Sequence, residues 1–422
     1  MKRSILYFLE GYKLTEQSKK KPNFFHLALP FSIVNGVVWG IGIMVIPLLA
    51  QTSMKAGLAF AMLNMGIGIG AIMWSILSHT IKIKNLIFAS SILSCVGWLL
   101  IILFHNAFLI PLVFVFGFFA AGIFALASVI ITNTYDKPQW DKYISLMQAV
   151  MTIGTVVGLL IVSAYTNAIV AVPFLIIGFL SYIPLARYHN HIAKHHELNS
   201  SLLKPKMHFS EIFTGYFYHR FKIKHILHLK NKRILLINLG WIFALLAAAP
   251  IYAMYPLLMK HMFFVKESLS SLIYAISTGL GVVFFIMAGK ISEKHSPFFS
   301  FNIGIFLYIL SFVLMFLGIY TSLHLLGVIG FIFMIIAWSF LAVGMNISIV
   351  RLVNESKRSE LLGVANMLQS FDNVIGGFIG GVIATHFGYT YVILFSLVFT
   401  IFAMIAGGGL LRRKFQLSAE NP

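Results

Sequence analysis

The chain has 422 residues, of which 59% are hydrophobic and 10% charged, and its formal net charge is +19. Soluble globular domains carry about 25% charged residues, so the composition excludes a soluble protein and favours one that crosses a membrane repeatedly. A single cysteine, Cys95, excludes a disulfide framework.

Twelve apolar stretches follow one another along the chain, each long enough to cross a hydrocarbon core of about 30 Å as a helix of roughly 20 residues. They come after a polar segment, 1–26, whose residues Ile5 to Tyr12 are expected to lie in the membrane interface rather than to form a signal peptide. The predicted spans are 27–51, 56–78, 86–104, 108–134, 143–165, 168–186, 234–258, 268–290, 298–320, 323–350, 361–385 and 389–411.

The basic residues alternate between the two sides of the predicted membrane. Of the 31 Lys and Arg, 28 fall in the first segment, in the connections after even-numbered spans and in the tail. The other connections hold only Lys55, Lys260 and Lys266. By the positive-inside rule both termini are cytoplasmic, as expected for a multi-pass protein of the cell (inner) membrane. The positive charge therefore faces lipid headgroups, and we expect no nucleic-acid partner.

One long hydrophilic connection divides the spans six and six. The division predicts an N-terminal segment 1–26, a six-helix bundle 27–186, a linker 187–233 with an amphipathic piece at 209–227, a second bundle 234–411 and a tail 412–422. Weak internal repetition follows the same division, as expected for secondary transporters built from repeats. The matches are IPLLAQ (46–51) with YPLLMK (255–260), GIG (66–68) with GLG (279–281), and Gly154 and Gly158 with Gly376 and Gly380.

Two local motifs add to this organisation. GKISEKHS (289–296) follows span 8, and RLVNESKRSELLGVANMLQS (351–370) joins spans 10 and 11. With twelve spans in a six-plus-six arrangement, the chain resembles the major facilitator superfamily over residues 27–411. The resemblance implies an all-α fold of two pseudo-symmetric six-helix bundles. It also implies a cytoplasmic gate formed by Gly289, Glu293 and Lys294, with Arg351 as the partner of Glu293; the alternative is an ordinary charged turn.

The chain departs from the family pattern at three places. The first-half copy of the loop motif, near WSILSHTIKIKN (74–85), has no acid. Span 4 lacks the arginine of many proton-driven relatives, and span 5 lacks the Gly-Pro dipeptide of drug/proton antiporters. These departures argue against a standard multidrug exporter.

Asp372 is the only one of the twelve acids near the middle of a span. An ionisable group at that depth costs about 3 kcal/mol on insertion scales and is a functional-site hypothesis by default. We predict that it couples transport to protons or binds substrate; the alternative is a structural acid bonded to Gln369 or to another helix. Small and polar residues from Asn366 to Gly380 share one face of this helix, and GGFIGG (376–381) is interpreted as a close-packing surface.

Other polar residues occupy spans that, by the resemblance, line a central cavity. For each of them, a hydrogen bond between helices is the alternative role. An aromatic, amide-rich cavity without a fixed positive charge favours a neutral, amphipathic or cationic solute over an anion. The candidates are Asn35, Trp39, Asn64, Gln148, Asn238, Trp241, Tyr252, Tyr255, Asn346, Asn366, Gln369 and Asn373.

The linker is rich in histidine, but His191 and His195 have no firm set of further ligands, so no metal and no other cofactor is predicted. No catalytic motif or ATP-binding motif is present, which excludes an enzyme and leaves an ion or solute gradient as the energy source. The sequence therefore predicts a monomeric secondary transporter, a symporter or antiporter, that moves a small organic solute by alternating access and uses protons through Asp372. The alternatives are an uncoupled facilitator with a structural Asp372 and a non-transporting membrane receptor or assembly subunit.

Overall fold

The computed structural model describes residues 29–78, 81, 83–134, 137–165, 167–180, 232–352 and 355–412. Over these residues, ten helices are long and apolar enough to cross a membrane. The elements are α3 (Leu29–Ala50), α4 (Ser53–Leu77), α5 (Ile83–Thr134), α6 (Lys137–Ala164), the 3-10 helix η1 (Ala168–Val170), α7 (Ala171–Leu180), α11 (Lys232–Met262), α12 (Glu267–Lys294), α13 (Pro297–Tyr320), α14 (His324–Leu352), α15 (Glu355–His386) and α16 (Tyr389–Arg412).

Helix α5 is two helices that fold back on each other. Its backbone leaves the helical region at Phe108, and Pro111 stands in the following turn. The two arms then lie side by side, because Ser90 Oγ donates to the carbonyl of Phe119 at 2.7 Å and the rings of Trp98 and Phe116 are 5.1 Å apart. The break falls between the predicted spans 86–104 and 108–134. Each predicted span thus overlaps a helix, and the sixth is described as far as Leu180.

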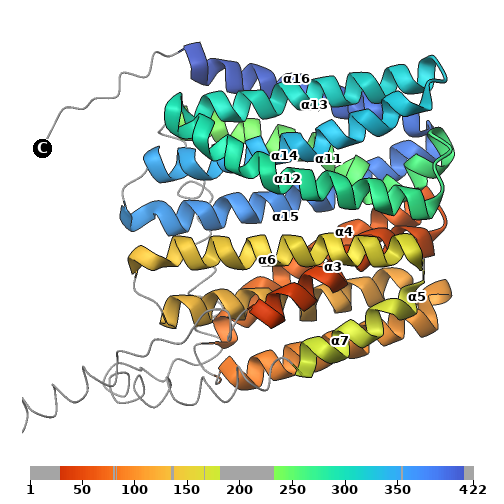
Figure 1. Cartoon of the computed structure of the whole chain (residues 1–422), viewed down its shortest axis with the longest axis vertical. Coiled ribbons are helices and arrows are strands. Elements are labelled where there is room, and N and C mark those ends of the chain that lie inside the picture. The colour runs from red at the N-terminus through yellow and green to blue at the C-terminus, as the bar shows by residue number, and fades with distance from the viewer. Residues whose placement is uncertain are drawn as a thin grey trace, which may run out of the picture.

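The helices lie side by side in two groups that follow the chain (Figure 1). We call α3 to α7 the N-terminal half and α11 to α16 the C-terminal half. Within the halves, α3 packs on α6, α4 on α5, α11 on α15 and α16, and α13 on α14. Between the halves, the main packing pairs are α4 with α15 and α6 with α12. The N-terminal segment, the linker and the tail, with His191, His195 and the amphipathic piece, lie outside the described residues.

Glycines mark equivalent helix contacts in the two halves. In the N-terminal half, Gly154 and Gly158 of α6 pack directly on the backbone of α3, where Gly154 meets Gly36. In the C-terminal half, Gly376 and Gly380 of α15 pack on α11. The repeat predicted from these glycines therefore has the same packing role in both halves: small residues let membrane helices approach closely.

The other glycine match differs from the sequence alignment by two residues. Gly66 packs on α5 within its own half, and the residue with that role in the C-terminal half is Gly281, which meets α14 at Ser339. Gly68 instead faces Ser370 across the halves, and Gly279 faces open space. GIG and GLG are thus similar in sequence but shifted in their contacts.

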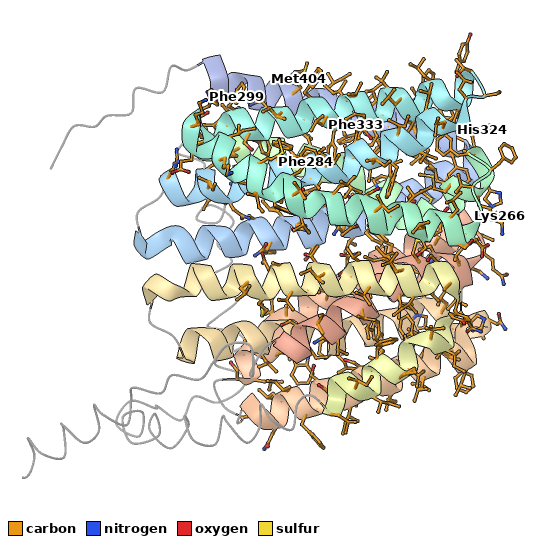
Figure 2. All side chains as sticks on the ribbon, in the orientation of Figure 1. Lys266, Phe284, Phe299, His324, Phe333 and Met404 are labelled. Carbon is orange, nitrogen blue, oxygen red and sulfur yellow. The ribbon has the colours of Figure 1, made fainter. Side chains whose placement is uncertain are left out.

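We call the end of the bundle that carries residues 51–52, 263–266 and 387–388 the outer end, since the charge distribution predicts that it faces away from the cytoplasm. Lys266 and His324 lie at this end in Figure 2, and Phe299 lies at the opposite end.

Candidate functional site

Helix α15 presents two adjacent stripes of small and polar residues to two different neighbours. The first stripe contains Asp372, Gly376 and Gly380, spaced four residues apart and so on one face of the helix. A methyl group at Gly376 would lie 2.6 Å from Cβ of Ala249, and one at Gly380 would lie 2.6 Å from Cβ of Pro250. This stripe therefore faces α11, within the C-terminal half.

The second stripe contains Asn373, Gly377 and Gly381 and faces α4 of the N-terminal half. A methyl group at Gly377 would lie 2.8 Å from the ring of Phe60, and the Cα of Gly381 is 2.7 Å from the methyl position of Gly57. Nearer the middle of the helices, Asn373 Nδ2 donates to Asn64 Oδ1 at 3.1 Å. The structure therefore joins two predicted cavity residues in a hydrogen bond between the halves.

Asn64 is held in place by its own helix. Its Nδ2 donates to the carbonyl of Phe60 at 2.9 Å, one turn earlier in α4, which leaves its Oδ1 to accept from Asn373. The side chain is buried, with 7% of its surface exposed. A buried amide with both ends bonded has a defined orientation, so Asn64 presents an acceptor to the other half.

Asp372 is enclosed by its neighbours: 4% of its surface is exposed, and its Oδ2 is buried without a hydrogen-bond partner. Phe371 and Phe378, on the opposite side of α15, are 63% and 45% exposed. The ion pair within the described part of the chain joins Lys260 and Glu267, far from Asp372 in sequence. Asp372 is thus a buried acid that forms no ion pair within the described part of the chain, and it lies on the stripe of α15 that packs on α11.

Two tryptophans lie farther from the outer end than Asp372 does. Trp241 of α11 stacks on Trp338 of α14, with ring centroids 5.4 Å apart, and its Nε1 donates to the carbonyl of Ala365 at 3.2 Å. Asn238, one turn away on α11, is buried and its Nδ2 has no partner. Sequence reasoning missed Trp338, although it lies in a predicted cavity-lining span and the criterion that selected Trp241 would have found it.

The two predicted tyrosines of α11 differ in their surroundings. Tyr255 is fully buried, donates its hydroxyl to the carbonyl of Ser270 at 2.8 Å, and stacks on Phe331 at 3.9 Å. It belongs to the packed interior of the C-terminal half. Tyr252, by contrast, is half-buried.

The remaining candidates are more accessible. Gln148, Asn346 and Asn366 are exposed, while Asn35, Trp39 and Gln369 are half-buried. Their contribution to a substrate site stays a prediction.

The proposed gate residues lie at the ends of α12 and α14 that are opposite the outer end. Glu293, Lys294 and Arg351 are exposed, and a methyl group at Gly289 would meet open space. Among the described residues, Glu293 and Arg351 form no ion pair. The gate, too, stays a prediction.

Three contacts close the outer end between the halves. Ser53 of α4 and Tyr389 of α16 share a hydrogen bond of 2.8 Å between their hydroxyls, and Ser271 Oγ of α12 donates to the carbonyl of Leu159 in α6 at 2.6 Å. The third is the glycine contact of Gly57 with Gly381. No sequence signal singles out Ser53, Ser271 or Tyr389, because each side chain stands near a helix end, where polar residues are common.

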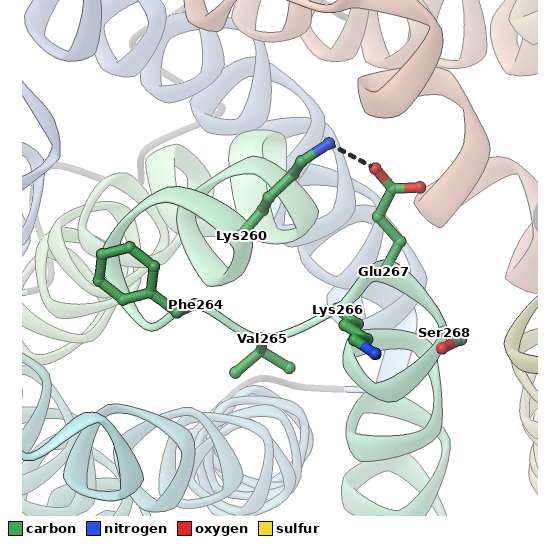
Figure 3. A pocket seen from close by; sticks show the side chains of 6 residues that line it. All are labelled: Lys260, Phe264, Val265, Lys266, Glu267 and Ser268. Carbon is green, nitrogen blue, oxygen red and sulfur yellow. Dashed lines mark hydrogen bonds and ion pairs between the residues drawn. The ribbon is translucent and has the colours of Figure 1, made fainter.

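A shallow depression of about 480 Å³ lies at the outer end, between the end of α11 and the start of α12. It is lined by Lys260, Lys266, Glu267 and Ser268, and Lys260 and Glu267 form an ion pair of 2.8 Å at its rim (Figure 3). No group of three or more metal-binding side chains occurs among the residues that the structure describes.

The fold and the polar groups between its halves define a polytopic membrane protein of the transporter type. The sequence profile of the Major Facilitator Superfamily matches residues 28–371. The chain therefore belongs to this superfamily. No match is found among curated protein sequences.

Solved transporters have the same fold. The nucleoside transporter NupG superimposes with a TM-score of 0.69 at 15% identity, covering 93% of this chain and 99% of that one. A POT family transporter in complex with a thioalcohol-conjugated peptide gives 0.68 at 14% identity, with coverage of 90% and 94%. A bacterial homologue of the iron transporter ferroportin, in an inward-facing state, gives 0.65 at 11% identity, with coverage of 91% and 98%.

Proposed function

We propose that this protein is a secondary transporter of the cell (inner) membrane that moves a small organic solute by alternating access, coupled to protons through Asp372. In this proposal both termini lie in the cytoplasm and the protein acts as a monomer. Membership of the Major Facilitator Superfamily supports transport. The observation that supports the proton coupling is the buried carboxyl of Asp372, whose Oδ2 has no hydrogen-bond partner, on the stripe of α15 that packs on α11.

The physical reason is the cost of charge. An ionised carboxylate without a partner or water bears its full desolvation cost, which a neutral carboxyl avoids. The conformation with a closed outer end therefore favours Asp372 with its proton bound. A conformation that admits water to α11 and α15 favours release, so the two conformations differ in proton affinity, as coupling requires.

The substrate class follows from the polar groups. The amides of Asn64 and Asn373 and the tryptophan pair offer hydrogen bonds and aromatic surface, while no cation stands near them among the described residues. This favours a neutral, amphipathic or cationic solute. Nucleosides and short peptides are the first solutes to test, because two of the similar structures are transporters of these or in complex with them.

The test is uptake of radiolabelled nucleosides, short peptides, sugars and amines into proteoliposomes, with and without an imposed pH gradient. We expect the gradient to drive accumulation by the wild type, and Asp372→Asn to retain exchange but lose accumulation. Glu267→Gln, an equivalent change at the outer end, should accumulate solute normally.

Two results would contradict the proposal. Accumulation by Asp372→Asn equal to that of the wild type would make the acid structural and the protein an uncoupled facilitator or differently coupled. No transport of any solute, together with tight binding of a protein partner, would favour the receptor alternative.

A further inference from the structure

Asp372 and Asn373 are consecutive residues that face different halves of the molecule. Asp372 is on the stripe that packs against Ala249 and Pro250 of α11, and Asn373 bonds to Asn64 of α4 across the halves. Consecutive residues of a helix are rotated by about 100° around its axis. A rotation or shift of α15 against α11 therefore also moves Asn373 relative to α4.

The packing around α15 permits such a movement. Both stripes of α15 continue toward the outer end as glycines. Gly376 and Gly380 contact α11, and Gly377 and Gly381 contact α4. Glycines leave no side chains to interlock, so these contacts resist rotation or sliding of the helix less than knobs of larger residues would. Asn64–Asn373 is the directional contact in this interface, since a hydrogen bond depends on distance and angle.

We propose that the Asn64–Asn373 hydrogen bond transmits the protonation state of Asp372 to the closure between the halves, with Asn373 as a positioning residue for coupling. This inference rests on the proposed function, and it names the contact that links the protonation of Asp372 to the closure of the outer end. When Asp372 is neutral, α15 packs closely on α11 and Asn373 bonds to Asn64, so the outer end is closed. When Asp372 loses its proton, the charge favours contact with water. Helix α15 then moves away from α11, and the bond to Asn64 breaks.

The other titratable groups of the packed helices lie away from Asp372. On α11, Tyr252 and Tyr255 are two turns or more nearer the outer end, and Lys260 and His261 are in its last turn. Lys55, Tyr389 and Tyr391 stand in the first turns of α4 and α16, and His324 and Arg351 in the terminal turns of α14. On α15 itself, Glu355, Lys357, Arg358 and Glu360 belong to the first two turns, and His386 is the last residue. Asp372 is therefore the group of the α4–α15 and α11–α15 contacts that changes charge in mid-helix.

Asn64 and Asn373 lie on only one of the two main interfaces between the halves. The other interface, α6 with α12, is closed near its outer end by Ser271 and Leu159. Gly154 and Gly158 of α6 correspond to Gly376 and Gly380, so the position equivalent to Asp372 is Val150 and the position equivalent to Asn373 is Met151. The proposed link between protonation and closure therefore involves α15 and has no counterpart on α6.

The experiment measures the distance between the halves at the outer end by double electron–electron resonance spectroscopy. Spin labels are attached at Lys55→Cys in α4 and Lys266→Cys before α12, both exposed, in a Cys95→Ala background in liposomes. We expect the short distance to dominate at acidic pH and a longer one to grow as the pH rises. In Asp372→Asn, the short distance should persist at all pH values.

The inference predicts that Asn64→Ala and Asn373→Ala each reduce the pH-dependent change in the ratio of short to long distances by at least about fivefold, the lower end of typical coupling between sites. The double variant should be no more affected than either single variant, because one bond is lost in all three. Asn302→Ala serves as the matched control: it removes an amide that bonds to Phe298 and Gly407 within the C-terminal half. It should keep the full pH dependence, even if it is less stable.

The outcomes separate the two proposals. If the wild-type distance depends on pH and both alanine variants keep that dependence, the Asn64–Asn373 linkage is overturned and proton coupling stands. If the wild-type distance does not change with pH, proton coupling through Asp372 fails, and the linkage fails with it. Loss of the dependence in Asn302→Ala as well would also overturn the linkage, since general destabilisation would then account for the effect.

Discussion

Tyr255 illustrates how the surroundings of a single residue decide its role. Its hydroxyl donates to the Ser270 carbonyl, and its ring packs against Tyr274 and Phe331 with centroids 5.0 and 3.9 Å away. The side chain is fully buried. The bond closes the α11–α12 corner from inside, so Tyr255 contributes to the stability of the C-terminal half.

We therefore predict that Tyr255→Phe lowers the free energy of unfolding by about 0.5–1.5 kcal/mol, because the Ser270 carbonyl loses the hydroxyl donor while its place in α12 and the ring contacts of residue 255 remain. Unfolding of the detergent-solubilised protein, followed by circular dichroism during denaturant titration, measures this change. Tyr320→Phe is the control, since Tyr320 is 80% exposed and should lose almost nothing. Equal stability of the two variants would show that the Ser270 bond contributes nothing.

At the scale of elements, α15 packs through glycines on two helices with different consequences. Gly380 meets Pro250 within one half, and this contact is part of the folded bundle. Gly57 of α4 meets Gly381 across the halves, and the proposed alternating access requires this contact to break when the outer end opens. The same type of substitution should therefore affect stability at one site and conformation at the other.

We predict that Gly380→Leu lowers thermal stability, since overpacking a tight contact typically costs about 1–3 kcal/mol. Gly57→Leu should leave stability nearly unchanged and open the outer end. Labelling of Ser271→Cys by a membrane-impermeant maleimide, in a Cys95→Ala background, measures the opening. Gly279→Ala is the control, because a methyl group there meets open space. Slow labelling of the Gly57→Leu variant, as in the control, would contradict the prediction.

The sequence predicted the elements better than their contacts. Hydropathy located the helices and the break near Phe108, and the glycine pattern of α15 predicted close packing. The sequence placed Gly376 and Gly377 on one face, whereas the structure assigns them to α11 and α4. It also could not pair Asn64 with Asn373, or Trp241 with Trp338. Helical periodicity gives the direction of a side chain but not the identity of the helix on that side.

For the whole molecule, the contacts between the halves define one conformation. The bonds Ser53–Tyr389 and Ser271–Leu159 and the contact of Gly57 with Gly381 all lie toward the outer end. They occur on both packing interfaces between the halves, α4 with α15 and α16 on one side and α6 with α12 on the other. Alternating access requires these contacts to break in every transport cycle.

A covalent link across one of them should therefore stop transport. We predict that Ser53→Cys with Tyr389→Cys, joined by a short bifunctional thiol reagent in a Cys95→Ala background, abolishes solute uptake, and that cleaving the link restores it. Phe264→Cys with His324→Cys is the matched pair: these rings lie 5.0 Å apart at the same end, but both belong to the C-terminal half. Linking them should leave uptake intact, because the half moves as a unit. Continued uptake with the first pair fully linked would mean that the halves do not separate at α4 and α16 during transport.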